Sequence, residues 1–306
     1  MTNEDLDTAL RLAAFAYLGE LTREREHPVV GWDEVHEGFR FRGGSVPLIG
    51  ASGIWKPACL DLPISVTTAP PRPNRQAPYD DRQSEDGAIL YRYRGTDPSH
   101  PQNRGLLRVA DERRPLIYFF GLSMGRYFAS WPVLVLRNDE VPLAVRLQVD
   151  DATALGASGG IVVGEGDPRR AYITTQTRRR LHQAAFRQRV IVAYRGSCSI
   201  CRLRRESLVE ASHIIPDAEG GEPRVSNGLA LCKIHHAAFD QHILGITPDY
   251  EVQVRSDVLD EEDGPMLQHG LKEMHGGRLV VLPRIDHLKP DRGLLARRYE
   301  RFRAAR

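Results

Sequence analysis

Residues 198–240 read CSICRLRRESLVEASHIIPDAEGGEPRVSNGLALCKIHHAAFD, and two sets of potential ligand side chains interleave within them. One set is arranged in pairs, with two residues between the partners of each pair: Cys198, Cys201, Cys232 and His235. The other set combines imidazole, amide and carboxylate groups: His213, Asn227, His236 and Asp240. Any fold of this region has to bring each set together, so the stretch decides the architecture of the C-terminal half.

The paired set has the spacing of a structural zinc site. Such sites are tetrahedral and commonly use three cysteines and one histidine, with paired ligands about three residues apart. Two intervening residues let the chain turn until both side chains reach one ion. A redox role for Cys198 and Cys201 is disfavoured, because no thioredoxin-like βαβ pattern surrounds them. We therefore expect one structural Zn²⁺ per chain, with a relic that has lost its metal as the alternative.

The second set predicts a divalent-metal site on a ββα unit. The segment LVEASHIIP is typical of a strand that ends at His213 and is stopped by Pro216. The segment LALCKIHHAAFDQHI begins as a strand and becomes a helix, on which His236 and Asp240 share one face. A histidine whose pKa is near about 6.5 can take a proton from water at neutral pH. The alternative is a zinc-ribbon binding module that merely contains both histidines.

Three parts of the stretch resemble the HNH endonuclease family, namely EASHIIP, SNGLALC and HHAAFD. The resemblance implies that His213 is the general base and that Asn227 fixes the segment bearing it. It also implies that His236 binds the catalytic metal. Asp240 is then the expected second ligand of Mg²⁺, Mn²⁺ or another divalent ion. Many family members have an Asp or His just before the base, where this chain has Ser212.

The charge distribution points to nucleic acid more clearly than the total charge. The 306 residues carry a formal net charge of only +2. Residues 169–205, however, contain eleven arginines and no acidic residue. Such a block is a phosphate-binding footprint, and a solvated helix face is the alternative. The candidates for DNA contact within the block are Arg178, Arg179, Arg180 and Arg187.

Cysteine usage and the N-terminus bear on the compartment. Three of the four cysteines lie in the quoted stretch, which favours metal binding over disulfides and predicts a reducing compartment. The first residues are acidic and lack the basic-then-apolar pattern of a signal peptide. No run of about 18 apolar residues is present. We expect a cytoplasmic protein with no membrane partner.

The N-terminal half predicts a helix followed by many short strands. Residues 3–24 follow the i, i+3, i+4 spacing of an amphipathic helix. From Gly53 onward, short apolar runs alternate with Gly, Pro, Asn and Asp, which is typical of strands and turns. Regular strand spacing favours a curved sheet or a partly open barrel with flanking helices. Together with the ββα unit, this predicts an α+β chain.

Aromatic and arginine side chains in this half can stack on and cradle nucleic acid, and strand core is the alternative. The run SEDGAILYRYRGTDPSHPQNRGLLRVA, with PLIYFFG and WPVLVL after it, resembles N-terminal modules of bacterial restriction-type nucleases. More loosely it is similar to the YDG or SRA-like fold that senses modified cytosine, with Asp86-Gly87 as its "DG" and Glu85 in place of its tyrosine. The DNA-contact candidates here are Trp55, Tyr79, Asp86 and Tyr91.

The sequence therefore predicts an SRA-like recognition domain at 1–155, a Gly-rich linker at 156–172 and an HNH domain at 173–306. The expected function is a modification-dependent endonuclease that cuts double-stranded DNA near 5-methylcytosine or 5-hydroxymethylcytosine. Cutting both strands takes two active sites, so we expect a homodimer. The alternatives are an unspecific or nicking HNH nuclease and a zinc-dependent DNA-binding protein without catalysis.

Overall fold

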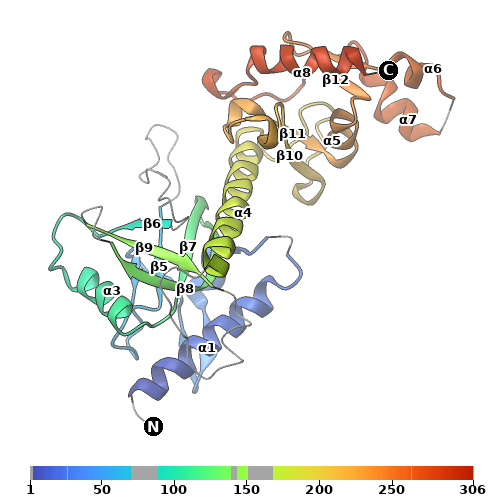
Figure 1. Cartoon of the computed structure of the whole chain (residues 1–306). Helices are drawn as coiled ribbons and strands as arrows, with labels where there is room; N and C mark the ends of the chain where they lie inside the picture. The colour runs from blue at the N-terminus through green and yellow to red at the C-terminus, as the bar shows by residue number, and fades with distance from the viewer. Residues whose placement is uncertain are drawn as a thin grey trace. The chain divides into compact units, whose positions relative to one another are not determined.

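The computed structural model describes residues 3–25, 27–69, 89–138, 143–150, 168–262 and 264–305 (Figure 1). The chain divides into two compact units, residues 1–184 and 185–306. Each unit has its own hydrophobic core. No helix among the described residues has the length and apolar composition needed to cross a membrane.

Unit 1 is built on one curled sheet with helices beside it (Figure 1). Its helices are α1 (Asn3–Thr22), α2 (Trp32–Glu37) and α3 (Pro101–Asp111). Its short strands are β1 (Val29–Gly31), β2 (Phe39–Phe41), β3 (Gly44–Val46), β4 (Ile54–Trp55), β5 (Ser65–Thr67) and β6 (Ile89–Arg92). Its longer strands are β7 (Leu116–Ser123), β8 (Arg126–Arg137) and β9 (Ala144–Val149).

Seven strands of unit 1 form the main sheet, in the order β4-β5-β7-β8-β9-β6, with β1 also paired to β8. β5 and β7 are parallel, and the other pairs are antiparallel. The pairing of β7 with β8 shifts register at two irregularities, and such bulges increase strand twist and bend the sheet. The expected curved sheet is therefore present as a curled half-barrel within a mixed α+β chain.

Helix α1 covers one face of this sheet. Its apolar residues Leu10, Ala14 and Leu18 are fully buried and pack with strand residues such as Ile117 and Phe119. Arg11 is also buried, and its guanidinium forms two hydrogen bonds to Asp7, at 2.8 and 3.0 Å. The guanidinium of Arg11 also donates to the carbonyl oxygens of Pro115 and Pro63. Arg11 thus has an ion-pair partner in Asp7 and links α1 to two loops that are distant in sequence.

Helix α3 corrects the expectation that the region after Gly53 consists of strands alone. It begins at Pro101, a favoured first position, after His100 accepts a hydrogen bond from the amide of Gln102. Leu106 and Val109 are three residues apart and fully buried. The segment NRGLLRVA therefore has the residue spacing of a helix, although its short apolar run is equally compatible with a strand. Strands β2 and β3, which follow α2, form a separate antiparallel pair.

Helix α4 (Pro168–Ala193) contains the point at which the two units divide. In unit 1, buried Thr174 bonds both the amide and the carbonyl oxygen of Val149, at the end of β9. At the other end, Gly196 has a φ of 66° and its amide bonds the carbonyl of Ile191, which stops the helix. Residues 156–167 of the expected linker lie outside the described residues.

Unit 2 consists of small sheets and short helices around one core. Its strand pairs are β10 (Val209–His213) with β11 (Gly228–Cys232), and β12 (Leu244–Ile246) with β13 (Val252–Val254). Its α-helices are α5 (Lys233–Asp240), α6 (Ser256–Asp260), α7 (Pro265–Gly270) and α8 (Arg292–Ala304). Its 3₁₀ turns are η2 (Glu206–Leu208), η3 (Asp217–Glu219), η4 (Val225–Asn227), η5 (Lys272–Met274) and η6 (Asp286–Leu288).

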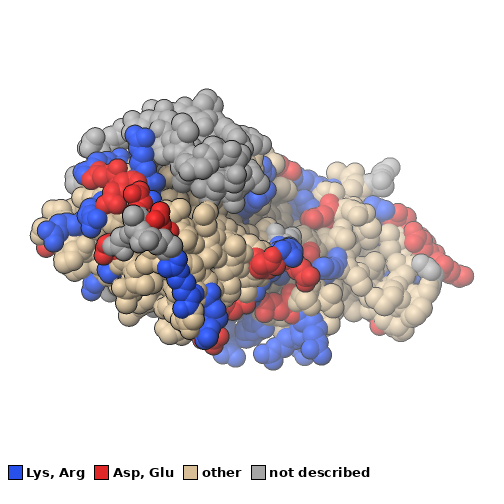
Figure 2. Space-filling view, turned by 90° about the horizontal axis from the view of Figure 1, so that it is seen from below, with Lys and Arg blue, Asp and Glu red and all other residues tan. Residues whose placement is uncertain are grey.

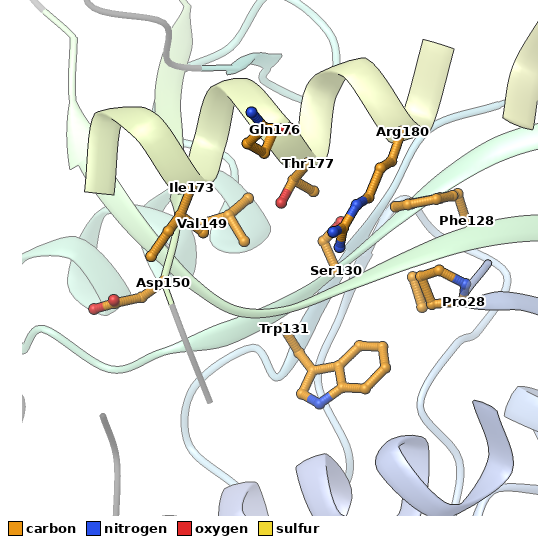
Figure 3. A pocket seen from close by; sticks show the side chains of 11 residues that line it. Pro28, Phe128, Ser130, Trp131, Val149, Asp150, Ile173, Gln176, Thr177 and Arg180 are labelled. Carbon is orange, nitrogen blue, oxygen red and sulfur yellow. The ribbon is translucent and has the colours of Figure 1, made fainter. Parts of the chain in front are cut away.

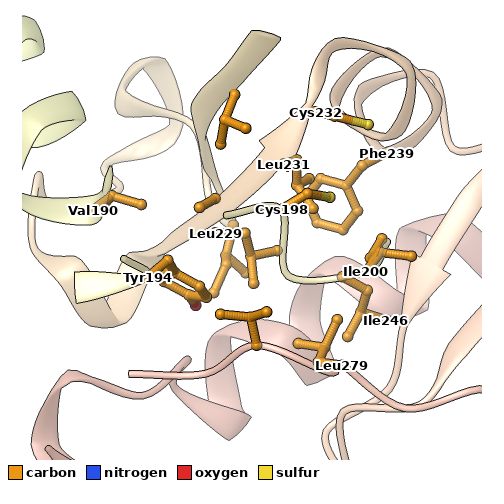
Figure 4. Close-up of a cluster of buried hydrophobic side chains, with 14 of the residues drawn as sticks. Val190, Tyr194, Cys198, Ile200, Leu229, Leu231, Cys232, Phe239, Ile246 and Leu279 are labelled. Carbon is orange, nitrogen blue, oxygen red and sulfur yellow. The ribbon is translucent and has the colours of Figure 1, made fainter. Parts of the chain in front are cut away.

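The core of unit 2 joins helix α4 to the ββα elements (Figure 4). It contains the buried side chains Val190, Tyr194, Cys198, Leu229, Leu231, Phe239, Ile246 and Leu279. Outside the named strands, an isolated bridge pairs Arg278 with Glu251 among the described residues. The predicted strand, loop, strand and helix of residues 209–240 are present and place the site described next.

Candidate active site and metal centre

The four paired ligands converge on one point. The ligand atoms of Cys198, Cys201, Cys232 and His235 all lie within 4.8 Å of one another. The sulfurs of Cys201 and Cys232 are 3.9 Å apart, and Nδ1 of His235 is 3.1 Å from the sulfur of Cys232. Zn–S bonds of about 2.3 Å in a tetrahedron give sulfur separations of about 3.8 Å. These separations fit a single ion.

The first cysteine pair is formed by a tight turn of the chain. The amide of Arg202 bonds the carbonyl of Cys198, and Arg202 has a φ of 62°. The amide of Ser199 bonds the carbonyl of Ala230, which ties the turn to β11. Cys232 ends β11 and immediately precedes α5, so the second pair sits where strand becomes helix. Strand pairing therefore brings the two halves of the cluster together.

His235 is oriented for metal binding through Nδ1. Its other nitrogen, Nε2, lies 2.8 Å from the carbonyl oxygen of Gly270 and donates to it. Burial lowers the pKa of His235, but its hydrogen bonds with Cys198, Cys201 and Cys232 raise the pKa by a larger amount. The net result is a pKa of about 12. The three sulfurs thus favour positive charge at Nδ1, which is where a metal cation would replace the proton.

Asn227 holds the segment that follows His213. Its side-chain oxygen accepts from the amide of Ile215 at 2.9 Å. Its side-chain nitrogen donates to the carbonyl oxygens of Ile215 and Glu222, both at 3.0 Å. Its own carbonyl accepts from the amide of Ile214. Because Asn227 is fully buried, these bonds are shielded from water and fix the end of β10.

The loop between the two strands folds back closely over this end. A Cβ on Gly221 would lie 1.8 Å from the carbonyl oxygen of Ile215 and 2.9 Å from the side-chain nitrogen of Asn227. Such distances exclude any larger side chain without movement of the backbone. The glycine is therefore needed for the loop to reach the amide of Asn227.

His213 is the last residue of β10 and lies opposite Gly228 of β11. Its ring stacks on Phe186, with 3.8 Å between ring centroids and 13° between the ring planes. Burial lowers the pKa of His213, while Asp217 and Asp240 raise it and His236 lowers it. The imidazole is thus kept neutral, the form that can accept a proton.

His236 lies between two carboxylates. Its Nδ1 is 2.7 Å from Oε2 of Glu210 on β10, and its Nε2 is 3.3 Å from Oδ2 of Asp240, one turn along α5. When Nδ1 carries the proton and donates to Glu210, Nε2 and Oδ2 are two electron-pair donors facing each other. A cation between them removes this repulsion, and ligand atoms at right angles around Mg²⁺ are about 3 Å apart. His236 and Asp240 fit a divalent ion.

Helix α8 supports the end of α5 through Arg298. The guanidinium is buried and donates to the carbonyl oxygen of Phe239 at 2.9 Å, and it lies over the Phe239 ring at 4.8 Å. It is also 3.8 Å from Oδ1 of Asp240. Burial lowers the pKa of Arg298, and Asp240 raises it. The arginine therefore holds both the helix terminus and the carboxylate.

Residues 198–247 match the family described as HNH endonuclease. Unit 2 carries an HNH endonuclease domain. The matched residues contain β10, β11 and α5, and they include the paired Cys/His ligands together with His213, Asn227, His236 and Asp240. The HNH domain is thus a nuclease domain with a Cys/His cluster that can hold a metal ion.

Among the solved structures that match this chain, two are described as restriction endonucleases. The one described as "Modification dependent TagI restriction endonuclease" is 19% identical, covers 78% of this chain and 81% of that chain, and has a TM-score of 0.29. The one described as "Type IV phosphorothioation-dependent restriction endonuclease ScoMcrA" is 15% identical, covers 82% and 59%, and has a TM-score of 0.23. With TM-scores below 0.5, neither supports a common overall fold. No curated protein matched by sequence.

Ser212, directly before His213 of the HNH domain, is only 1% exposed. The carboxylate that does reach His236 belongs to Glu210, two residues earlier. Sequence reasoning missed Glu210, although an acidic residue within the apolar pattern VEASHII was a signal for it.

Sequence reasoning also missed Phe186 and Arg298. Phe186 precedes the HNH match and carries no spacing signal, because its partner His213 lies far along the chain. Arg298 occupies a position three residues after buried Leu295 and four before buried Phe302, so it interrupts an apolar helix stripe. A cation in such a stripe indicates a specific acceptor.

Two of the four DNA-contact candidates of unit 1, Trp55 and Tyr91, lie within the described residues. Tyr91 is 3% exposed and donates to the carbonyl of Gly53, so its ring packs in the core. Half-buried Trp55 donates to the carbonyl of Pro47. Tyr79 and Asp86 lie outside the described residues, as does the side chain of Arg178 on α4. The side chains of Trp55 and Tyr91 are thus held by backbone carbonyls, and DNA contact by this set stays a prediction.

The arginine candidates on α4 differ in their surroundings. Arg179 and Arg180 are exposed. Arg187 is half-buried and donates to the carbonyl oxygen of Val209 at 3.1 Å, so it supports the first residue of β10. Figure 2 shows basic and acidic side chains intermingled on the face in view, in keeping with the small net charge.

Unit 1 has a hollow of about 530 Å³ beside the first half of α4 (Figure 3). Phe128 and Ser130 of β8 line it together with Thr177 and Arg180 of α4. Ser130 is 4% exposed, and its hydroxyl has no hydrogen-bond partner among the described residues. The hollow thus combines apolar surface with polar groups, and it is separate from the HNH site.

Proposed function

We propose that this chain is a divalent-metal-dependent DNA endonuclease whose HNH domain hydrolyses phosphodiester bonds. The observation that carries the proposal is the arrangement of His213, held at a strand end by Asn227, beside the His236–Asp240 pair of α5. A neutral imidazole and a pair of hard ligands are what metal-assisted hydrolysis needs. The match of residues 198–247 to the HNH family supports the same reaction.

Each residue has a distinct task in this proposal. His213 takes the proton from the attacking water, because burial keeps its imidazole neutral near physiological pH. Asn227 keeps that imidazole in place through the backbone of Ile215. His236 and Asp240 hold Mg²⁺, Mn²⁺ or another divalent ion, which neutralises charge on the phosphate when bound. Glu210 fixes the ring of His236 by accepting from Nδ1.

The Cys/His cluster is proposed to bind structural Zn²⁺. Three sulfurs and one imidazole nitrogen at tetrahedral separations form the donor set that zinc prefers. The ion would clamp the loop that carries His213 and Asn227. In this proposal the cluster stabilises the HNH domain and takes no part in the chemical step.

We propose further that unit 1 makes cleavage depend on modified cytosine in double-stranded DNA. Support comes from the resemblance of the runs within residues 84–136 to N-terminal modules of restriction-type nucleases and to SRA-like folds. The curled sheet of unit 1 is compatible with such a module. Because the chain contributes one HNH site, double-strand cleavage would use a homodimer on DNA.

Metal-stripped protein provides the test of the nuclease proposal. After EDTA treatment and dialysis, plasmid cleavage should return with Mg²⁺ or Mn²⁺, and His213→Ala should bind DNA without cutting it. Retained cleavage by His213→Ala would remove His213 from the role of base. DNA binding without cleavage under every metal condition would favour the zinc-dependent binding protein.

A panel of plasmids tests the substrate. Unmodified, 5-methylcytosine and 5-hydroxymethylcytosine plasmids of one sequence should be cut at different rates. Equal cleavage of all three would leave an unspecific HNH nuclease, and single nicks alone would leave a nicking enzyme. Analytical ultracentrifugation of the chain with a modified duplex checks for two chains per DNA.

A further inference from the structure

One side chain outside the HNH match contacts the proposed base directly. Phe186 lies on α4, twelve positions before the matched segment begins at Cys198. It is 2% exposed and stacks on His213 at 3.8 Å between ring centroids, nearly parallel. A parallel stack restricts rotation of the imidazole about its side-chain bonds and covers one of its two faces.

The strand opposite His213 leaves space for this ring. Gly228 pairs with His213 across β10 and β11. A Cβ on Gly228 would lie 3.0 Å from the tip of the Phe186 ring and 2.5 Å from a methyl of Val190. Any larger residue at this position would therefore crowd both Val190 and the Phe186 ring beneath His213. The hydroxyl of Tyr194 donates to the carbonyl of Gly228 at 3.1 Å and fixes the strand against α4.

Helix α4 is also fastened to the start of β10. Arg187, next to Phe186, donates to the carbonyl oxygen of Val209 at 3.1 Å. Consecutive residues of the helix thus contact the first and the last residue of the strand that bears the base. Hydrogen bonds from Arg187 to β10 and from Tyr194 to β11 therefore hold the helix that carries Phe186 against the two strands.

We propose that Phe186 is a positioning residue for His213: it sets the plane of the imidazole and excludes water from one of its two faces. This inference rests on the proposed role of His213 as the base. The charged and titratable groups acting on His213 are Asp217 from η3 and His236 and Asp240 from α5. Phe186 contributes no charge and acts through contact alone.

The test compares Phe186→Leu with Ile191→Ala in the full-length protein. Leucine keeps the site apolar but has no flat ring, whereas Ile191 lies on the same helix and is buried in the same core. We expect Phe186→Leu to lower kcat by roughly 10–100-fold with KM within about twofold, since small misplacements of a base have effects of this size. Ile191→Ala should retain kcat after correction for the folded fraction.

The pH dependence of kcat/KM provides a second test. Loss of stability alone would not change the midpoint of its acidic limb. Water reaching the uncovered face would stabilise the imidazolium, so the acidic limb of kcat/KM should shift to higher pH in Phe186→Leu. Gly228→Ala should shift the limb in the same direction, because it crowds the ring while keeping Phe186. A folded Phe186→Leu protein with unchanged kcat and unchanged acidic limb would overturn the inference.

The result for His213→Ala separates the two proposals. If His213→Ala is inactive while Phe186→Leu behaves like the unaltered protein, the positioning role alone is wrong. If His213→Ala still cleaves DNA, the assignment of the base is wrong, and the positioning role is overturned with it.

Discussion

The carboxylate of Glu210 accepts a hydrogen bond from Nδ1 of His236 at 2.7 Å, and this contact joins the first strand of the ββα unit to its helix. The acceptor fixes which ring nitrogen carries the proton. Nε2 is thereby left free on the side of Asp240, 3.3 Å away. A carboxylate behind a ligating histidine raises the basicity of that ligand and holds its ring.

Replacing Glu210 with Ala should weaken the response to the catalytic metal. Loss of such an acceptor typically costs about 10–100-fold in metal affinity or activity. We expect the Mg²⁺ or Mn²⁺ concentration for half-maximal plasmid cleavage to rise by a factor in this range. Exposed Glu262 provides the matched control, and Glu262→Ala should leave the metal titration unchanged. An unchanged titration in Glu210→Ala would show that the contact has no role in metal binding.

Replacing Cys198 with Ala should remove the structural metal and unfold the HNH domain. Zinc in such sites contributes roughly 10–16 kcal/mol near neutral pH, which exceeds the stability of most domains. Elemental analysis should find about one zinc per chain in the unaltered protein and far less in the variant. Cys59 is exposed and belongs to unit 1, so Cys59→Ala should keep the metal. Folded, metal-free protein would contradict a structural role for zinc.

Asn227→Asp should destabilise the strand end that carries His213. The substitution replaces the nitrogen that donates to the carbonyls of Ile215 and Glu222 with a buried oxygen facing two other oxygens. Unsatisfied buried groups cost about 1–3 kcal/mol each. Urea denaturation followed by circular dichroism should show a loss of about 2–5 kcal/mol. Amide hydrogen exchange should become faster in β10 and β11. Unchanged exchange there would argue that the side-chain hydrogen bonds of Asn227 do not hold the strand end.

The cleavage rate should fall at acidic pH, with a midpoint below about 6.5. Burial lowers the pKa of His213, so the folded protein resists protonation that the unfolded chain accepts. Stability from this group is therefore present above its unfolded pKa and is lost as pH falls toward its folded pKa. The pH dependence of kcat/KM checks the first statement. In His213→Ala, the free energy of unfolding should depend less on pH over the same range.

Arg298→Met should reduce both stability and cleavage. The change removes the guanidinium donor from the carbonyl of Phe239, which keeps a longer bond of 3.3 Å from the amide of His242, and Asp240 loses the nearby positive charge. A hydrogen bond to a charged group contributes about 1.5–3 kcal/mol. Arg297, the preceding residue, is exposed, so Arg297→Met tests loss of charge on the same helix without loss of the contact. Equal thermal stability and activity in the two variants would show that Arg298 does not support α5.

Much of unit 2 could be predicted because its determinants are local. The spacing of Cys198 and Cys201, and of Cys232 and His235, anticipates a cluster that the fold brings within 4.8 Å. The run from β10 through β11 to α5 follows from β-branched and helical patterns in the same stretch. In unit 1 the short apolar runs predicted strands, but α3 was hidden because helix and strand cannot be separated by a short run alone.

The sequence by itself determined which ligands are paired, the elements that carry them and the match to an HNH domain. Only the tertiary structure decided that Glu210 accepts from His236, that Phe186 stacks on His213 and that Arg298 holds the end of α5. The physical reason is the separation in sequence between the interacting residues. Ligand spacing and helix periodicity are set within a few residues, whereas these three contacts depend on strand register and on how α4 and α8 pack around the core.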